Sequence, residues 1–184
     1  LFAGYQQDGS RVGRSYLRFN NLVTTPDPNL KIWPVGGLQI FVPRLAKTGS
    51  VTLTTRKLSD ETFSPSSLVW SNAPSLGASI ANSGTINWNA TSPTRQWISI
   101  NTTPEVQDAV KTDGNLALSL QSANEGTAGW AYIARPGYID STYTLPLSSL
   151  TPPDGLAPFL IYAIGGDGAE LGALSVTPNT VTSG

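Results

Sequence analysis

The sequence "GRSYLRFNNL" (residues 13–22) alternates between apolar and polar residues with the period of a β-strand. Leu17 and Phe19 fall on one face of this strand, while Arg14 and Arg18 fall on the other. An apolar face opposite a polar face is typical of a sheet that packs on a core with one side. The fold class therefore depends on whether the rest of the chain contains more strands of this kind.

The composition favours β-structure and excludes several kinds of chemistry. The 184 residues include 18 Gly and 14 Pro, only 12% are charged, and Thr, Ser and Asn fill many polar positions. The absence of Cys and His removes the thiolate nucleophile, Cys-ligated zinc and the usual general base at neutral pH. The 11 Lys and Arg nearly balance the 12 Asp and Glu, so no basic field attracts nucleic acid. No apolar run approaches the roughly 20 residues that span a bilayer.

Short strand-like segments recur along the chain between Gly, Pro, Asn and Asp residues. They are residues 14–19, 37–42, 50–58, 85–89, 96–100, 115–122, 129–135 and 158–164. Only one helix is expected, in "TTPEVQDAVKTDG" (102–114), where Pro104 suits the first turn and Val106 and Val110 share a face. This pattern predicts an all-β antiparallel sandwich with one short helix.

The composition changes after the last of these strands. We expect a β-sandwich over residues 1–164, a Gly-rich linker over residues 165–172, and the first strand of a following module over residues 173–184. The segment "ALSVTPNTVTSG" (173–184) resembles the start of the immunoglobulin-like modules of bacterial surface proteins. Since the chain starts at Leu1 without a charged region before an apolar stretch, we interpret it as part of a longer exported protein, secreted or at the cell surface.

Four segments resemble, in the same order along the chain, segments of one known protein family. They are "GRSYLRFNNL" (13–22), "KLSDETFSPSSLVWSNAPSLG" (57–77), "WISINTTPEVQDAVKTDGNLALSLQS" (97–122) and "AYIARP" (131–136). Together they resemble the DNRLRE-type domain, a jelly-roll-like β-sandwich related to carbohydrate-binding module family 96. The resemblance implies a non-catalytic extracellular module that binds a polysaccharide, acidic ones included.

The resemblance also suggests roles for arginines and tryptophans. Because the arginine-bearing strand is a fold signature of the family, Arg18 and Arg135 are interpreted as pairing partners and backbone-carbonyl donors between sheets. The alternative is that one of them faces an acidic sugar. Trp70 and Trp97 fall in segments that match the family core, so they are expected to be structural.

Other aromatic residues fall in turn-rich or Pro-rich segments, where a large ring is hard to bury. An exposed ring can stack on the apolar face of a sugar, although each ring could instead cover a small apolar cluster beneath its loop. The candidate carbohydrate-binding residues are Trp33, Trp88, Tyr138 and Tyr143.

No catalytic or metal-ligating residues are assigned from the sequence. Asp60 and Glu61 are adjacent, so in an extended chain they point to opposite faces and cannot act as a pair. Turn carboxylates and carbonyls suit calcium, but no calcium-loop pattern is present, and no cofactor is assigned. The sequence therefore predicts a binding module and not an enzyme.

A structural role is the alternative to carbohydrate binding. Family members usually carry a strand before the position of Leu1, and its absence predicts an open sheet edge. A neighbouring copy could donate a strand to such an edge. The low charge and the module-like tail also fit a self-associating subunit of an extracellular filament, sheath or surface layer.

Overall fold

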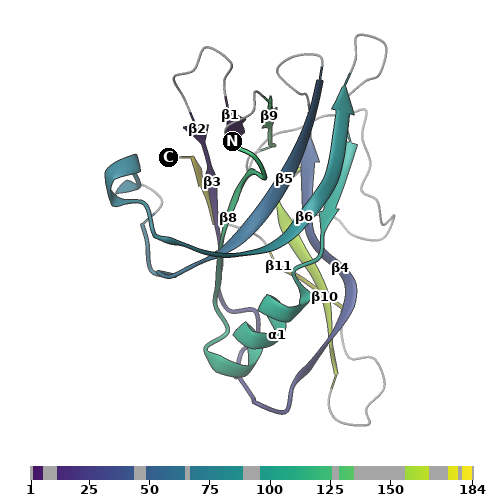
Figure 1. Cartoon of the computed structure of the whole chain (residues 1–184). Coiled ribbons are helices and arrows are strands. Elements are labelled where there is room, and N and C mark those ends of the chain that lie inside the picture. The colour runs from purple at the N-terminus through teal and green to yellow at the C-terminus, as the bar shows by residue number, and fades with distance from the viewer. Residues whose placement is uncertain are drawn as a thin grey trace.

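The structure, a computed structural model, describes residues 2–5, 12–43, 49–64, 67–88, 96–125, 129–134, 156–165, 174–177 and 180–183 (Figure 1). Within these residues the strands form three antiparallel sheets of five, four and three strands. The five-stranded sheet has the order β12 (Thr180–Ser183), β3 (Ser15–Phe19), β8 (Leu116–Ser122), β5 (Gly49–Leu58) and β6 (Leu76–Trp88). The four-stranded sheet has the order β11 (Leu174–Thr177), β10 (Phe159–Gly165), β4 (Lys31–Val42) and β7 (Gln96–Ile100). The three-stranded sheet has the order β2 (Val12–Gly13), β1 (Phe2–Tyr5) and β9 (Gly129–Tyr132).

The main apolar core is built by residues of both larger sheets, because their apolar positions recur with period two. Its buried members include Leu17, Phe19, Leu53, Leu118, Leu38, Ile40, Ile100 and Leu160. Tyr162 is buried with them, and its hydroxyl donates to the Leu22 carbonyl oxygen at 2.6 Å, which satisfies its polar end. The prediction of an all-β antiparallel sandwich is confirmed, while jelly-roll connectivity stays a prediction.

One α-helix, α1 (Thr103–Thr112), packs on this core, as the sequence predicted. Its buried face consists of Val106, Ala109 and Val110. The N-cap residue, Thr102, makes no side-chain capping bond, but the Thr103 N–H donates to Asn101 Oδ1 at 3.0 Å, so an Asx turn leads into the helix. Gly114 ends it with a φ of +77°, a conformation that other residues rarely adopt.

Strands β4 and β6 are longer than predicted. Residues 38 and 39 of β4 pair with both β10 and β7, and residues 40–42 pair with β7. The first half of β4 pairs only with β10, at residues 31–33 and 37, so Pro34 removes no hydrogen bond to β7. Gly37 has a φ of +68°, and a Cβ there would collide with the Ile100 carbonyl oxygen. Trp33 lies in β4, where a turn-rich segment was expected, and Trp88 lies in β6, in the part that the predicted strand 85–89 covers.

The C-terminal strands pair with the sandwich itself. β11 pairs with β10, and β12 pairs with β3 with Thr180 opposite Arg18. The division into a sandwich, a linker and a following module stays a prediction, although these two strands lie in the sheets of the sandwich. At this end of the five-stranded sheet, β12 lies along β3 and occupies the edge. Residues 166–173, which include most of the predicted linker, lie outside the described residues.

Candidate functional site

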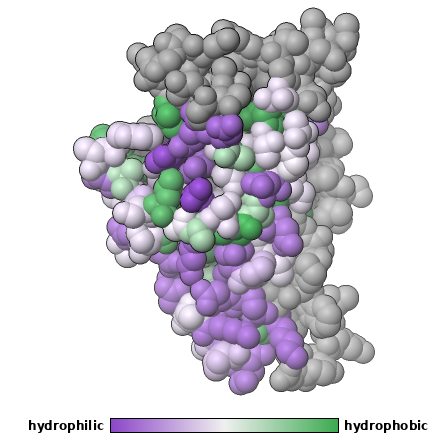
Figure 2. All heavy atoms as spheres, in the orientation of Figure 1, coloured by the Kyte–Doolittle hydropathy of each residue, from purple (hydrophilic) through white to green (hydrophobic). Residues whose placement is uncertain are grey.

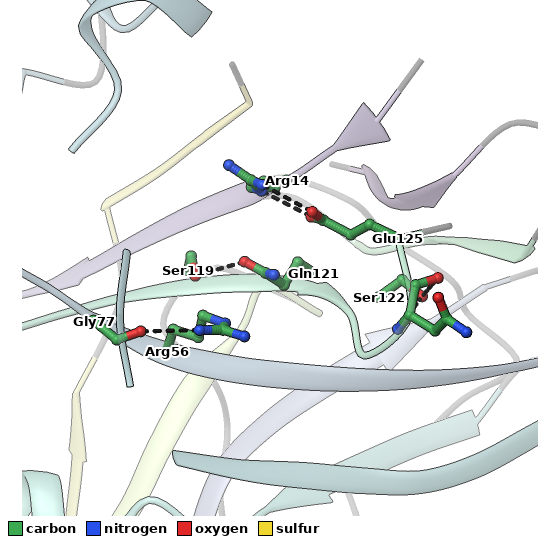
Figure 3. Close-up of polar contacts among 8 residues, drawn as sticks. Arg14, Arg56, Gly77, Ser119, Gln121, Ser122 and Glu125 are labelled. Carbon is green, nitrogen blue, oxygen red and sulfur yellow. Dashed lines mark hydrogen bonds and ion pairs between the residues drawn. The ribbon is translucent and has the colours of Figure 1, made fainter. Parts of the chain in front are cut away.

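The five-stranded sheet carries polar side chains on the face turned away from the core. We call this the outer face, and its residues on β3, β8 and β5 are Arg14, Tyr16, Arg18, Ala117, Ser119, Gln121, Thr54 and Arg56. The strand register places Tyr16 beside Ser119 and Ser119 beside Arg56. Ser119 Oγ donates to Gln121 Oε1 at 3.3 Å (Figure 3). Three guanidinium groups therefore lie along a single sheet face.

The segment between β5 and β6, residues 59–75, covers one end of the outer face. Phe63 and Leu68 from this segment are buried with Tyr16, and the rings of Tyr16 and Phe63 meet edge to face with centroids 6.2 Å apart. Arg18 Nη1 donates to the Phe63 carbonyl oxygen at 2.9 Å. Arg18 is thus a backbone-carbonyl donor as expected, but it holds this covering segment and does not connect two sheets.

A short 3-10 helix in the same segment, η2 (Trp70–Asn72), projects beyond the sheets (Figure 1). The side chain of Asn72, the last residue of this helix, bonds the backbone before its first residue. Its Oδ1 accepts from the Val69 N–H at 2.7 Å, and its Nδ2 donates to the Ser67 carbonyl oxygen at 2.9 Å. Together with the buried Leu68, these bonds hold the backbone that carries Trp70 in one conformation.

Arg14 and Glu125 form a two-point ion pair on the outer face (Figure 3). Arg14 Nε donates to Glu125 Oε1 at 2.8 Å, and Arg14 Nη2 donates to Glu125 Oε2 at 2.8 Å. Glu125 follows β8 in a turn that Ser122 stabilises through hydrogen bonds with the Asn124 backbone. The hydrogen bonds that Arg14 donates to Glu125 raise the pKa of its guanidinium, against the opposite effect of burial.

Trp70 lies against this ion pair. Its ring centroid is 4.9 Å from Arg14 Cζ, which is the distance of a cation–π contact. Trp70 is nevertheless 55% exposed, and Val69 beside it is 53% exposed. The expectation that Trp70 packs in the core is therefore wrong: the core of this segment is made by Phe63 and Leu68, and the indole is left at the surface.

The other predicted site residues fall in different places. Trp97 packs on Phe41 and Phe159, with ring centroids 5.3 Å from each. The backbones of Trp33 and Trp88 belong to β4 and β6, but their side chains lie outside what the structure describes. The remaining three, Arg135, Tyr138 and Tyr143, lie outside the described residues.

A shallow groove of about 370 Å³ lies between β5, β6 and α1. Lys57 and Glu105 line it, and Lys57 Nζ binds Asp108 Oδ2 at 2.7 Å. Burial raises the pKa of the Glu105 carboxyl. Because its lysine is already paired and no aromatic ring lines it, the groove is a weaker candidate than the outer face.

In the described part of the chain, neither a metal site nor a membrane-spanning helix is present. There, no group of three or more Asp or Glu side chains is arranged to hold a metal ion. In the same residues, no helix has the length and apolar character needed to cross a membrane.

Rigid sheets that support an exposed indole beside paired charged groups are typical of a β-sandwich binding domain. The family model of carbohydrate-binding module family 96 matches residues 4–138. The chain therefore belongs to carbohydrate-binding module family 96, and the sequence resemblance to this family is confirmed; the likeness to the DNRLRE-type domain stays a prediction. No curated protein and no solved structure matches the chain.

The sequence indicated the family but not the exposed position of Trp70. The signal that could have found it is the composition of "SSLVWSNAP" (66–74), where a turn-forming Ser-Asn pair follows the tryptophan directly. Val69 next to Trp70 suggested packing, yet both side chains are more than half exposed, whereas Leu68 and Phe63 of the same segment are buried.

Proposed function

We propose that this chain is a non-catalytic carbohydrate-binding module that holds a larger extracellular protein on a polysaccharide. The match of carbohydrate-binding module family 96 over residues 4–138 carries this proposal. Figure 2 supports it: hydrophilic residues predominate on the described part of the visible face, with smaller apolar patches between them. A surface of this kind suits a ligand with both hydroxyl groups and apolar ring faces.

An acidic polysaccharide is the preferred ligand. The Arg18 and Arg56 guanidinium groups each donate to a backbone carbonyl, from Phe63 and Gly77 respectively. Among the described residues neither contacts a carboxylate, whereas the charge of Arg14 is neutralised by its ion pair. Each guanidinium has five N–H donors; one donates to the carbonyl and the Nε–H is buried, so the remaining donors on the two Nη atoms are those that could meet a uronate or sulfate group.

Affinity electrophoresis tests the function. The protein is run in native gels cast with galactomannan or hydroxyethyl cellulose as neutral polymers, and with polygalacturonate, alginate or hyaluronan as acidic ones. Retardation by at least one polymer is expected, and retardation by an acidic polymer should weaken with added salt, because salt screens charges. Unchanged mobility in every gel would contradict the function.

Trp33, Trp88, Tyr138 and Tyr143 remain proposed sugar-stacking residues on sequence grounds. Single alanine variants of the four, run in the same gels, test each ring separately. A variant that migrates like the unmodified protein removes that residue from the binding site.

A filament or surface-layer subunit is the second candidate function. It is favoured by β6, a strand of 13 residues at the end of the five-stranded order, which could accept a strand from another copy. The pairing of β12 with β3 gives it less support, since that edge is occupied by the same chain. Electron microscopy of the purified protein separates the two functions: ordered filaments support assembly, and dispersed monomers support the binding module.

A further inference from the structure

We infer that Trp70, Arg14 and Glu125 form a subsite for one pyranose ring of the polysaccharide, with Trp70 as the stacking platform. This inference rests on the proposed carbohydrate-binding function and assigns it to residues outside the four proposed from the sequence. It starts from an unusual combination: an indole that is more than half exposed, on a backbone held in place, next to an ion pair with two hydrogen bonds.

Trp70 is more than half exposed although its segment also contributes to a buried apolar cluster. Burying an indole is among the largest apolar gains available to a domain, and two other apolar residues of the same segment, Phe63 and Leu68, are buried. The Arg14 guanidinium lies over the ring, 4.9 Å from its centroid. Because a cation covers one side, the opposite side of the indole is the one that can accept the apolar face of a sugar.

The backbone under Trp70 is already ordered before a ligand arrives. Asn72, two residues after the ring, bonds the backbone that precedes it, at Val69 and Ser67. Leu68 anchors the segment to the sheet. A ring presented in this way loses little conformational freedom on binding, so more of the stacking free energy contributes to affinity.

The ion pair supplies hydrogen bonds at the edge of the platform. A carboxylate has about four lone-pair sites and a guanidinium has five N–H groups, and the Arg14–Glu125 pair uses two of each. The remaining acceptors on Glu125 and donors on Arg14 suit the neighbouring hydroxyl groups of a sugar, each of which both donates and accepts. The side chains are 21% and 25% exposed, so these atoms are partly accessible to solvent.

The charge of this subsite distinguishes it from the rest of the outer face. Because Glu125 neutralises Arg14, the subsite recognises the ring and its hydroxyl groups and not a carboxylate of the sugar. An acidic group elsewhere on the same chain of sugars would meet Arg18 or Arg56. Substitution of Trp70 should therefore weaken binding to any polymer that the protein binds, whereas Arg56→Gln should weaken binding to acidic polymers only.

The test compares variants in the galactomannan, hydroxyethyl cellulose, polygalacturonate, alginate and hyaluronan gels. Trp70→Ala should weaken retardation about tenfold or more, Trp70→Tyr should retain most of it, and Arg14→Gln and Glu125→Gln should each weaken it several-fold. Ser71→Ala, an exposed neighbour in η2, and Lys57→Gln, which removes one positive charge on the opposite side of the sheet, are matched controls that should bind as the unmodified protein does. Thermal unfolding shows whether each variant is folded.

The possible results distinguish failure of the Trp70 subsite from failure of the proposed carbohydrate-binding function. Retardation of Trp70→Ala equal to that of the unmodified protein overturns the subsite and leaves the proposed function standing. Loss of binding in Ser71→Ala as well as Trp70→Ala also overturns it, since the effect would then belong to the segment and not to the ring. If the unmodified protein binds none of the five polymers, the proposed function fails, and the subsite fails with it. Concentration-dependent self-association that disappears in Trp70→Ala would overturn the subsite by assigning the ring to a protein contact.

Discussion

The two faces of the five-stranded sheet are made by the same strands, yet different interactions stabilise the buried residues on each face. On the inner face Leu17 lies opposite Leu118, and both are fully buried in the core. One residue along each strand, Tyr16 lies opposite Ser119 on the outer face, where both are also buried. The inner face is stabilised by apolar contacts, whereas the outer face depends on hydrogen bonds made by polar side chains.

The comparison shows where the sheet is optimised for stability and where it is not. In the described part of this sheet, three outer-face atoms, Tyr16 Oη, Arg18 Nε and Arg56 Nε, are buried without a hydrogen-bond partner, against one on the inner face, Thr55 Oγ1. Such atoms cost free energy, and a domain selected for stability alone would replace them with apolar groups. Polar groups kept on the outer face at this cost are consistent with a binding surface.

The largest effect is expected for the inner face. Leu118→Ala should lower the free energy of unfolding by about 2–5 kcal/mol, because it removes apolar contacts and leaves a cavity in the core. Ser119→Ala, the next residue on the opposite face, is the matched variant and should cost about 1 kcal/mol or less, since it loses one long hydrogen bond. Urea unfolding measures both. Equal losses would show that the two faces do not differ as described.

A smaller effect is expected for the contact that anchors the covering segment. Arg18→Met keeps the apolar stem but removes the bond to the Phe63 carbonyl oxygen, and should lower the free energy of unfolding by about 1–2 kcal/mol. Hydrogen exchange should become faster in residues 59–64. Arg56→Met, which loses a similar bond to Gly77, is the control and should leave exchange in that segment unchanged.

The two ion pairs on opposite sides of the sheet should differ in strength. A double-mutant cycle with Arg14→Gln and Glu125→Gln should give a coupling of about 1 kcal/mol or more, because the pair is bidentate and half-buried. The same cycle with Lys57→Gln and Asp108→Asn should give about 0.2–1 kcal/mol, since these side chains are 39% and 59% exposed. Coupling energies of the same size would show that the Arg14–Glu125 pair is held no more firmly than the exposed Lys57–Asp108 pair.

The smallest effect concerns pH. Burial raises the pKa of Glu105 above its ordinary value, so the folded state binds more protons than the unfolded state in this range, and stability falls as the pH rises through it. Glu105→Gln should therefore be more stable than the unmodified protein at pH 7, by less than about 1 kcal/mol because solvent screens the carboxyl, and this advantage should vanish at low pH.

Asp113 provides a control of opposite sign for the pH experiment. The Asn115 backbone N–H lowers the pKa of the Asp113 carboxyl, so its contribution is present at neutral pH and is lost as the pH falls through the lowered pKa. Asp113→Asn should then be less stable than the unmodified protein at pH 7. Thermal unfolding between pH 3 and pH 8 compares the two variants. If both were more stable, or both less stable, than the unmodified protein at pH 7, the assigned directions of the two pKa shifts would be contradicted.

The fold could be predicted from the sequence where local patterns agree with the final packing. Strict alternation located β3, and Pro104 with Val106 and Val110 located α1, because these signals are local. The first half of β4 was missed because Pro34 normally interrupts a strand, and only the one-sided pairing with β10 explains its presence.

The site could be predicted less well than the fold. The sequence shows that Arg14 and Arg18 share a face, but not that one of them binds Glu125 from a distant turn and the other binds the Phe63 carbonyl oxygen. The exposure of Trp70 depends on which neighbours fill the cluster above Tyr16, and this is a property of the packed structure.

The most direct test of the central claim, that polysaccharide binds on the outer face, is an NMR titration. Protein labelled with ¹⁵N is titrated with oligosaccharides cut from the polymer that retards it most in the gels. If polysaccharide binds on the outer face, the largest chemical-shift changes will occur at the Trp70 indole, at Arg14 and at Glu125, with smaller changes along β3 and β8. Changes confined to the four-stranded sheet, for example around Trp33 in β4, would contradict it.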